Sequence, residues 1–172
     1  MDYLSQIPLI TGSYWKYAIH DYVTATDDTL LETVIGDTIR QNNIKAKIIQ
    51  RRTYLYNVNS TYYVELGNNE LRFYRNYGAP SYYKKYAMPL EAGKDWTNFT
   101  YSDTTFIIGQ NQVVTSAGNF RAFALHRTAA IPTYSLNDTE YIVPNIGLVQ
   151  FSLVEPSASI FQSGQLVSYL IK

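Results

Sequence analysis

The chain has 172 residues, with 14 Lys and Arg balanced by 14 Asp and Glu, and it contains no cysteine. Zero net charge argues against a protein that binds the phosphate backbone of nucleic acids. The lack of cysteine excludes disulfides, cysteine nucleophiles and cysteine-ligated zinc. Apolar residues make up 46%, an ordinary share for a folded chain of this length, which predicts a single domain over residues 1–172.

The first ten residues lack the basic n-region and long apolar h-region of a signal peptide, and Met1 is interpreted as replacing a removed leader. Residues 8–15 then read Pro-Leu-Ile-Thr-Gly-Ser-Tyr-Trp. Proline ends the incoming segment, glycine permits a turn with positive φ, and tryptophan begins a strand and closes one end of a core. This PLxxGxxW pattern predicts a corner at the start of the first strand.

Short strands are expected next, because 17 tyrosines and many β-branched residues favour a pleated, half-buried surface. In the first half they are expected at residues 14–24, 30–35, 44–51, 62–66 and 71–74. Turns are expected at residues 25–28, 36–37 and 42–43, and residues 67–69 indicate a hairpin.

The PLxxGxxW pattern returns at residues 89–96, about half a chain length after its first occurrence. Weaker echoes pair Tyr63 with Tyr141 and Phe73 with Phe151. A tryptophan recurring with three other residue types at fixed offsets predicts an internal repeat. The predicted pseudo-repeats cover residues 7–86 and 87–172.

The second half repeats the scheme, with strands expected at residues 104–108, 112–115, 120–127, 141–143, 148–154 and 166–171. Turns are expected at residues 109–111 and 117–119, and a loop at residues 156–164. The expected fold is therefore mostly β and antiparallel, with little helix: two pseudo-repeated half-barrels or curved sheets in one domain. The expected core consists of Trp15, Trp96, Phe120 and Phe151, followed by Ile19, Val23, Leu125 and Leu148.

Aromatic and basic side chains interleave around the irregular segment at residues 75–88, which joins the two halves. Such residues can stack on sugars or bases or bind acidic peptides. Alternatively, the rings cover the seam between two half-sheets while the basic side chains extend outward. The candidate ligand-binding residues are Tyr74, Tyr77, Tyr82, Tyr83, Lys84, Lys85 and Tyr86.

No GxSxG, HExxH, Walker or GxGxxG pattern is present, and His20 and His126 are the only imidazoles. Asp21 follows His20, but neighbours on a strand point to opposite faces. Both histidines are interpreted as surface or strand-end residues. We expect no enzyme, no metal site and no cofactor.

Taken together, these motifs resemble those of bacterial envelope proteins of the Bacteroidetes type, which are uncharacterised, secreted or lipid-anchored, and built from two antiparallel half-barrels that close like a clam. The residues that carry the resemblance are Pro8-Leu9, Gly12, Trp15, residues 36–39, 62–64 and 68–74, Pro89-Leu90, Gly93, Trp96, and residues 117–120 and 144–149. The resemblance implies a periplasmic or cell-surface location and a distant likeness in fold to lipoprotein carriers, whose curved sheet holds an acyl chain.

Two functions remain open at this point. In the first, the protein is a non-catalytic envelope binding module that holds an apolar or amphipathic ligand between its halves. In the second, it is a structural or interaction domain with a filled core that contacts protein or glycan through the aromatic and basic surface at residues 72–86. Candidate partners are a hydrophobic small molecule, a lipid, a glycan or an envelope protein; neither nucleic acid nor a membrane span is expected.

Overall fold

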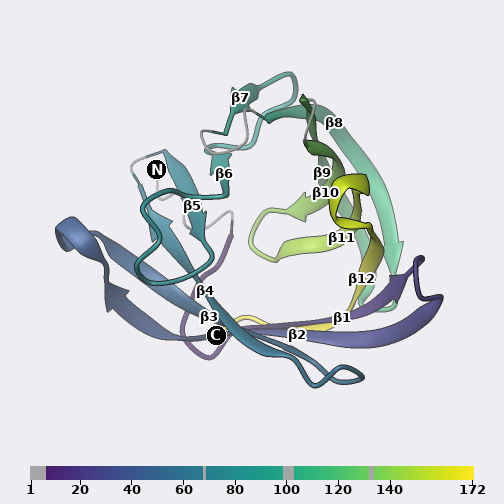
Figure 1. Ribbon diagram of the computed structural model, residues 1–172, viewed down its shortest axis with the longest axis horizontal. Coiled ribbons are helices and arrows are strands. Elements are labelled where there is room, and N and C mark those ends of the chain that lie inside the picture. The colour runs from purple at the N-terminus through teal and green to yellow at the C-terminus, as the bar shows by residue number, and fades with distance from the viewer. Residues whose placement is uncertain (1–6, 68, 99–102, 132–133) are drawn as a thin grey trace.

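The computed structural model describes residues 7–67, 69–98, 103–131 and 134–172 (Figure 1). Its strands are β1 (Tyr14–Asp21), β2 (Thr26–Ile39), β3 (Lys45–Thr53), β4 (Asn59–Leu66), β5 (Glu70–Tyr74), β6 (Lys84–Ala87), β7 (Asp95–Thr97), β8 (Thr104–Thr115), β9 (Gly118–Ile131), β10 (Tyr134–Val143), β11 (Gly147–Glu155) and β12 (Ile160–Leu170). Two short 3-10 helices, η2 (Gln41–Asn43) and η3 (Pro156–Ala158), are the only helices in the described ranges.

All twelve strands belong to one antiparallel sheet, in the order β6-β5-β4-β3-β2-β1-β12-β11-β10-β9-β8-β7. Each strand therefore pairs with its neighbour in the chain except β6 with β7, and β1 pairs with β12. The sheet curls into a nearly closed barrel whose break lies between β6 and β7 (Figure 1). The prediction of a mostly β, antiparallel fold with little helix is confirmed.

The two PLxxGxxW segments form corners with the same backbone hydrogen bond. Gly12 (φ 89°) donates its amide to the Val34 carbonyl at 2.8 Å, and Gly93 (φ 82°) donates to the Ile107 carbonyl, also at 2.8 Å. Positive φ is the conformation in which glycine is favoured. The six strands that follow each corner are contiguous in the sheet.

The predicted core is largely placed as expected. Trp15, Trp96, Phe120 and Leu125 are buried, and Ile19, Leu148 and Phe151 pack against them half-buried. Val23 was wrongly predicted, because 54% of it is exposed. β1 ends at Asp21, whose Oδ1 accepts the Val23 and Thr24 amides at 2.9 and 3.1 Å and turns the chain there.

Two predicted turns are also wrong, because β2 runs through residues 36–37 and β8 through residues 109–111. Instead, Ile35 and Ile108 are the extra residues of two β-bulges, each followed by a glycine. A glycine inside a strand often marks a bulge, which bends the strand and increases its twist. The predicted loop at 156–164 is shorter than expected, since β12 begins at Ile160. The hairpin at 67–69 is present, although Asn68 lies outside the described residues.

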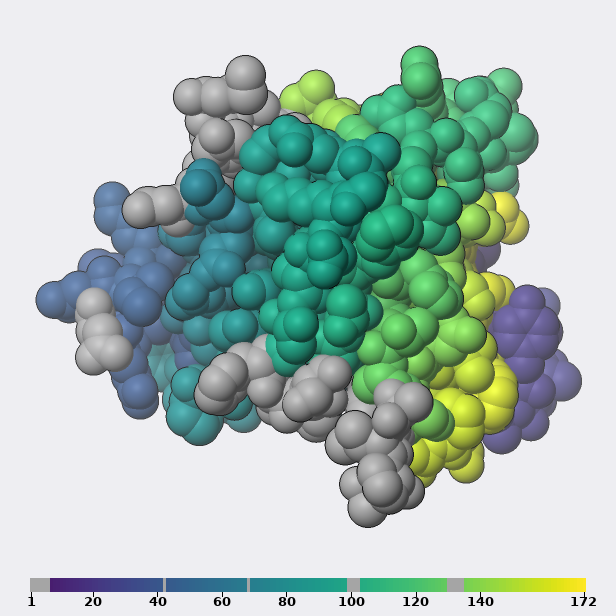
Figure 2. Space-filling view, turned by 90° about the horizontal axis from the view of Figure 1, so that it is seen from above, coloured from purple at the N-terminus to yellow at the C-terminus, as the bar shows by residue number. Residues whose placement is uncertain are grey.

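Side chains bridge the break between β6 and β7. The Trp96 indole donates to the Lys85 carbonyl at 3.0 Å, and the Lys85 amide donates to Asn98 Oδ1 at 2.8 Å. The Asn98 amide nitrogen in turn donates to Asp103 Oδ2 at 2.7 Å. We call Lys85, Trp96, Asn98 and Asp103 the seam. Figure 2 looks onto this face, where the teal residues of β6 and β7 lie between the two sets of strands.

Candidate functional site: a cavity inside the barrel

The barrel encloses a cavity of about 480 Å³, hereafter the interior cavity, with walls from both halves of the sheet. A second hollow of about 270 Å³ lies between the β1–β2 and β3–β4 hairpins. The two share five lining residues, namely Leu30, Arg51, Ser60, Phe151 and Gln162. The volume of the interior cavity lies within the range of typical small-molecule sites, about 300–1,000 Å³, whereas that of the second hollow lies below it.

One end of the interior cavity is apolar, and we call it the floor. Ile7, Leu9, Trp15, Ile142 and Gly147 line it. The Trp15 indole donates to the Ile146 carbonyl at 2.5 Å. A Cβ on Gly147 would lie 3.4 Å from the indole nitrogen, so this glycine lets the backbone pass close to the ring. The floor is thus closed by the first PLxxGxxW corner packed against the start of β11.

The opposite end, which we call the mouth, is polar. Its lining residues lie at or within two residues of strand ends: Ser60, Arg75, Glu155, Ile160 and Gln162. From here the second hollow continues to Tyr56 and Val58 at the hairpin tips. The cavity therefore changes from apolar to polar along its length, as an amphipathic molecule does.

Charged side chains line the cavity in equal numbers. The acids are Glu32, Asp138, Glu140 and Glu155, and the bases are Arg51, Arg75, Lys84 and Arg127. Two pairs join neighbouring strands, Arg51 Nε to Glu32 Oε1 at 3.4 Å and Arg127 Nε to Asp138 Oδ2 at 3.7 Å, and a third, Lys84 to Glu140, joins the two halves of the sheet. Pairing lowers the cost of holding charge away from water.

Asp138 and Glu140 titrate differently, although both point inward from β10. Burial, with the Glu140 charge beside it, raises the pKa of Asp138 to about 7. Burial alone would raise the pKa of Glu140, but Lys84, Arg127 and the Tyr86 hydroxyl together outweigh it and hold that pKa below its ordinary value. The Tyr86 hydroxyl donates to Glu140 at 2.9 Å. Glu140 is therefore ionised at neutral pH, whereas Asp138 changes charge near it.

Four tyrosines place their hydroxyl groups in or beside the cavity. Burial raises the pKa of Tyr17, Tyr62 and Tyr86, and that of Tyr83 to about 12, so all four remain neutral donors. The Tyr17 hydroxyl donates to the Leu148 carbonyl at 3.0 Å. Within the described residues, the Tyr62 and Tyr83 hydroxyls have no hydrogen-bond partner, and both line the cavity.

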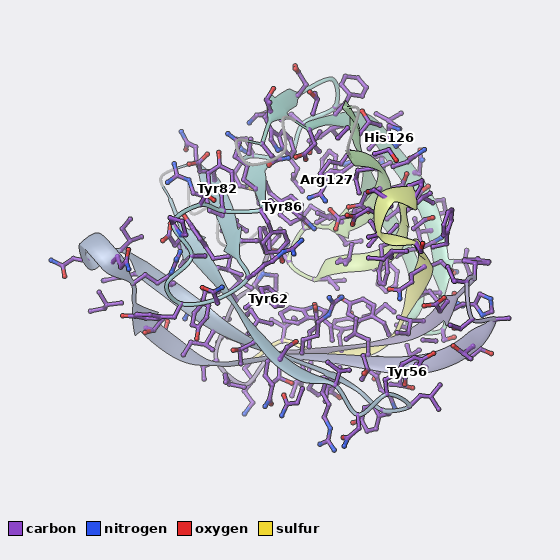
Figure 3. The ribbon with its side chains drawn as sticks, viewed as in Figure 1. Tyr56, Tyr62, Tyr82, Tyr86, His126 and Arg127 are labelled. Atoms are coloured by element: carbon purple, nitrogen blue, oxygen red, sulfur yellow. The ribbon has the colours of Figure 1, made fainter. Side chains whose placement is uncertain are left out.

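The structure divides the predicted binding residues between two faces of the sheet. Tyr83, Lys84 and Tyr86 line the interior cavity. In Figure 3, Tyr86 points to the inside of the barrel together with Tyr62 and Arg127. Successive residues of a strand point to opposite faces, so Lys85, between Lys84 and Tyr86, lies on the outside, with its ammonium 3.6 Å from Glu70.

Tyr74, Tyr77 and Tyr82 also lie outside, where internal contacts engage them. Arg40 lies 3.5 Å over the Tyr74 ring and bonds Glu65, which accepts the Tyr74 hydroxyl at 2.7 Å. The Tyr77 hydroxyl donates to the Ile39 carbonyl at 2.8 Å, and Tyr82 packs edge-on against Tyr74. These three residues hold the β5–β6 connection against the outer face of the sheet.

Sequence reasoning missed the cavity residues Glu32, Arg51, Arg127, Asp138 and Glu140. Their position along the strands could have revealed them: on β2, Glu32 lies on the same face as the buried Leu30 and Val34, because every second residue points to the same side. Likewise, Asp138 and Glu140 lie between Leu136 and Ile142 on the inward parity of β10. A charge on a buried parity indicates either a cavity or a buried ion pair.

The two histidines lie away from the cavity lining. His20 Nδ1 is 2.7 Å from Asp27 Oδ1 at the exposed β1–β2 hairpin, and His126 Nδ1 is 3.2 Å from Thr139 Oγ1. Asp27, the cross-strand neighbour, is thus the partner of His20. In the described ranges, no three metal-ligating side chains gather at one place.

The solved structures that share this fold include two bacterial proteins. One is the "putative exported protein with YmcC-like fold" of Bacteroides fragilis, at a TM-score of 0.57 and 10% identity, with 94% of this chain and 96% of that chain covered. The other is a "putative lipoprotein" of Parabacteroides distasonis, at a TM-score of 0.58 and 11% identity, with 95% and 97% covered. Both are proteins of Bacteroidetes-type bacteria. No protein-family profile and no curated protein matches the chain.

Proposed function

We propose that the protein is a non-catalytic binding module that holds a small amphipathic molecule inside its barrel. The observation that carries this proposal is the interior cavity, with its apolar floor at Trp15 and its charged mouth at Arg75 and Glu155. An apolar tail on the floor would be removed from water, while a polar head remains among charged and hydroxyl groups. The cavity weighs against the alternative of a domain with a filled core. The internal contacts of Tyr74, Tyr77 and Tyr82 weigh against a free aromatic surface.

We also infer that the protein acts outside the cytoplasm, in the periplasm or at the cell surface. The fold shared with an exported protein and a lipoprotein supports this location. The likeness to lipoprotein carriers would then lie in the use of a curved sheet around an apolar chain. Among the described residues, neither short helix has the length or apolar character needed to cross a membrane.

The two halves are inferred to be pseudo-repeats of one ancestral unit. The shared corner geometry at Gly12 and Gly93 supports this inference, as does the contiguity of six strands after each corner. On this view, ligand binding arises where two curved halves face each other across one interior.

The two tryptophans provide the test, because Trp15 lines the cavity and Trp96 does not. In a W96F variant, binding of an amphiphile with a dodecyl chain, added below its micelle concentration, should shift the Trp15 emission with a saturable dependence on concentration. The matched W15F variant retains only Trp96 and should show no such shift. If dodecanoate, dodecyl phosphate and dodecyl maltoside all leave Trp15 unchanged, and native mass spectrometry detects no complex, the proposed function is wrong.

A further inference from the structure

We propose that the cavity recognises the head group of its ligand as an anion, a carboxylate or a phosphate, and that Arg51 binds it. This inference rests on the proposed function and specifies the chemistry of its ligand. The tail would lie toward the floor at Trp15, and the head toward the mouth.

Arg51 is the residue at which the two hollows meet. It projects from β3, next to Ser60 of β4, and lines both the interior cavity and the second hollow. Its single ionic contact among the described residues is Nε to Glu32 Oε1, at 3.4 Å. Almost half of its side chain, 49%, remains accessible to solvent. The two Nη groups therefore have donors to spare for a planar or tetrahedral oxyanion.

Two hydroxyl donors lie near this guanidinium. Tyr62 is on the inward face of β4, two residues from the cross-strand partner of Arg51, and Tyr83 lies at the entry to β6. The charges of Arg51, Tyr62 and Tyr83 influence one another's pKa, which places the three groups in one electrostatic neighbourhood. Neither hydroxyl has a hydrogen-bond partner in the described ranges. An oxyanion held by Arg51 would supply the missing acceptor for both.

The pairing of the nearby charges favours an anionic head group. Lys84 of β6 pairs with Glu140 of β10, and Arg127 of β9 lies 3.4 Å from Asp103 and 3.7 Å from Asp138. On the wall that Arg51 occupies, Arg75 lies 5.4 Å over the Tyr83 ring and has no acidic partner among the described residues. Glu32 meets only the Nε of Arg51, and Glu155 lines the mouth without an ion pair among the described residues, so the Arg51 Nη groups and the Arg75 guanidinium have no bonded carboxylate. An anionic head would pair with these guanidinium donors, whereas a cationic or neutral head would not.

The test compares head groups on one tail. In the W96F background, dodecanoate and dodecyl phosphate should bind at least tenfold more tightly than dodecyltrimethylammonium. R51Q should weaken the two anionic probes by at least tenfold and change the affinity for neutral dodecyl maltoside by less than twofold. Y62F and Y83F should each weaken the anionic probes severalfold, and R51K should fall between R51Q and the parent.

R52Q is the matched control, because Arg52 is the next residue on β3, points to the opposite face and lies 5.4 Å over the exposed Tyr54 ring. It removes the same charge and should leave all affinities unchanged. Equal affinity for anionic and cationic probes, or equal effects of R51Q and R52Q, would overturn this inference while the proposed function stands. Failure of every probe to bind would overturn both.

Discussion

Asp138 is a buried acid at the centre of the paired charges, and its ionisation couples the stability of the barrel to pH. Its pKa of about 7 lies above the ordinary value of 3.8, because burial and the neighbouring Glu140 disfavour its charged form. An acid whose pKa is raised by folding stabilises the folded state fully below its ordinary pKa, and this stabilisation is lost as the pH rises through its folded pKa. For Asp138, this loss falls between about pH 4 and pH 7.

The first prediction concerns D138N, which cannot ionise. As the pH rises from 5 to 8, the wild type should lose about 1–3 kcal/mol of unfolding free energy that this variant keeps, because only the wild type must bury a new charge. Urea unfolding at the two pH values measures the difference. D95N on the exposed face of β7 is the control and should track the wild type. A D138N curve parallel to that of the wild type would show that Asp138 does not titrate in this window.

Gly164 shows how one small residue shapes the cavity wall. It lies opposite Phe151 in the pairing of β11 with β12, and a Cβ there would overlap the Phe151 ring. Phe151 in turn lines both hollows. The absence of a side chain at residue 164 therefore decides where this ring lies.

At the scale of elements, the sequence predicts most of the strands, because aromatic and β-branched residues alternate between clear turn residues. It does not predict how β2 and β8 continue, since Gly36 and Gly109 resemble turn residues and only the partner strand reveals a bulge. Nor does it predict the cavity: the same inward parity of Asp138 is compatible with a solid core holding ion pairs. The distance between walls decides between them, and long-range pairing sets that distance.

The seam is the element-scale feature on which barrel closure depends, because β6 and β7 are held by side chains in place of a ladder of backbone bonds. Asn98 is fully buried there and bonds Lys85, Asp103 and Thr105. Replacing it leaves buried donors and acceptors without partners, at a cost of about 1–3 kcal/mol for each.

The second prediction is therefore that N98A lowers the unfolding free energy by about 2–4 kcal/mol. Hydrogen exchange should accelerate most at the Lys85 amide, which loses its acceptor. N111A, at an exposed position of β8, should change stability by less than about 0.5 kcal/mol. An N98A variant as stable as N111A, with unchanged exchange at Lys85, would mean that the seam does not hold the barrel closed.

The whole molecule has two unlike ends, because consecutive hairpins alternate between them. The PLxxGxxW corner at Trp15 closes the floor, while the mouth and the second hollow lie among the tips of the β1–β2 and β3–β4 hairpins. Exposed apolar residues gather at these tips, namely Tyr22, Val23, Tyr54, Leu55, Tyr56 and Val58. A ligand should therefore enter head-last from the hairpin end, its tail passing Arg51 toward the floor.

The chain contains no cysteine, so a single introduced thiol reports on this route. Ser60 is exposed at the start of β4 and lines both hollows, whereas Thr97 is exposed on β7 and lines neither. Saturating dodecanoate should slow the reaction of S60C with a small thiol reagent severalfold, because the bound head group occupies the space beside residue 60. The rate for T97C should be unchanged. If dodecanoate shifts the Trp15 emission and yet leaves the S60C rate unaltered, the ligand does not occupy the mouth, and an entry route past the seam would replace the one argued from the hairpin end.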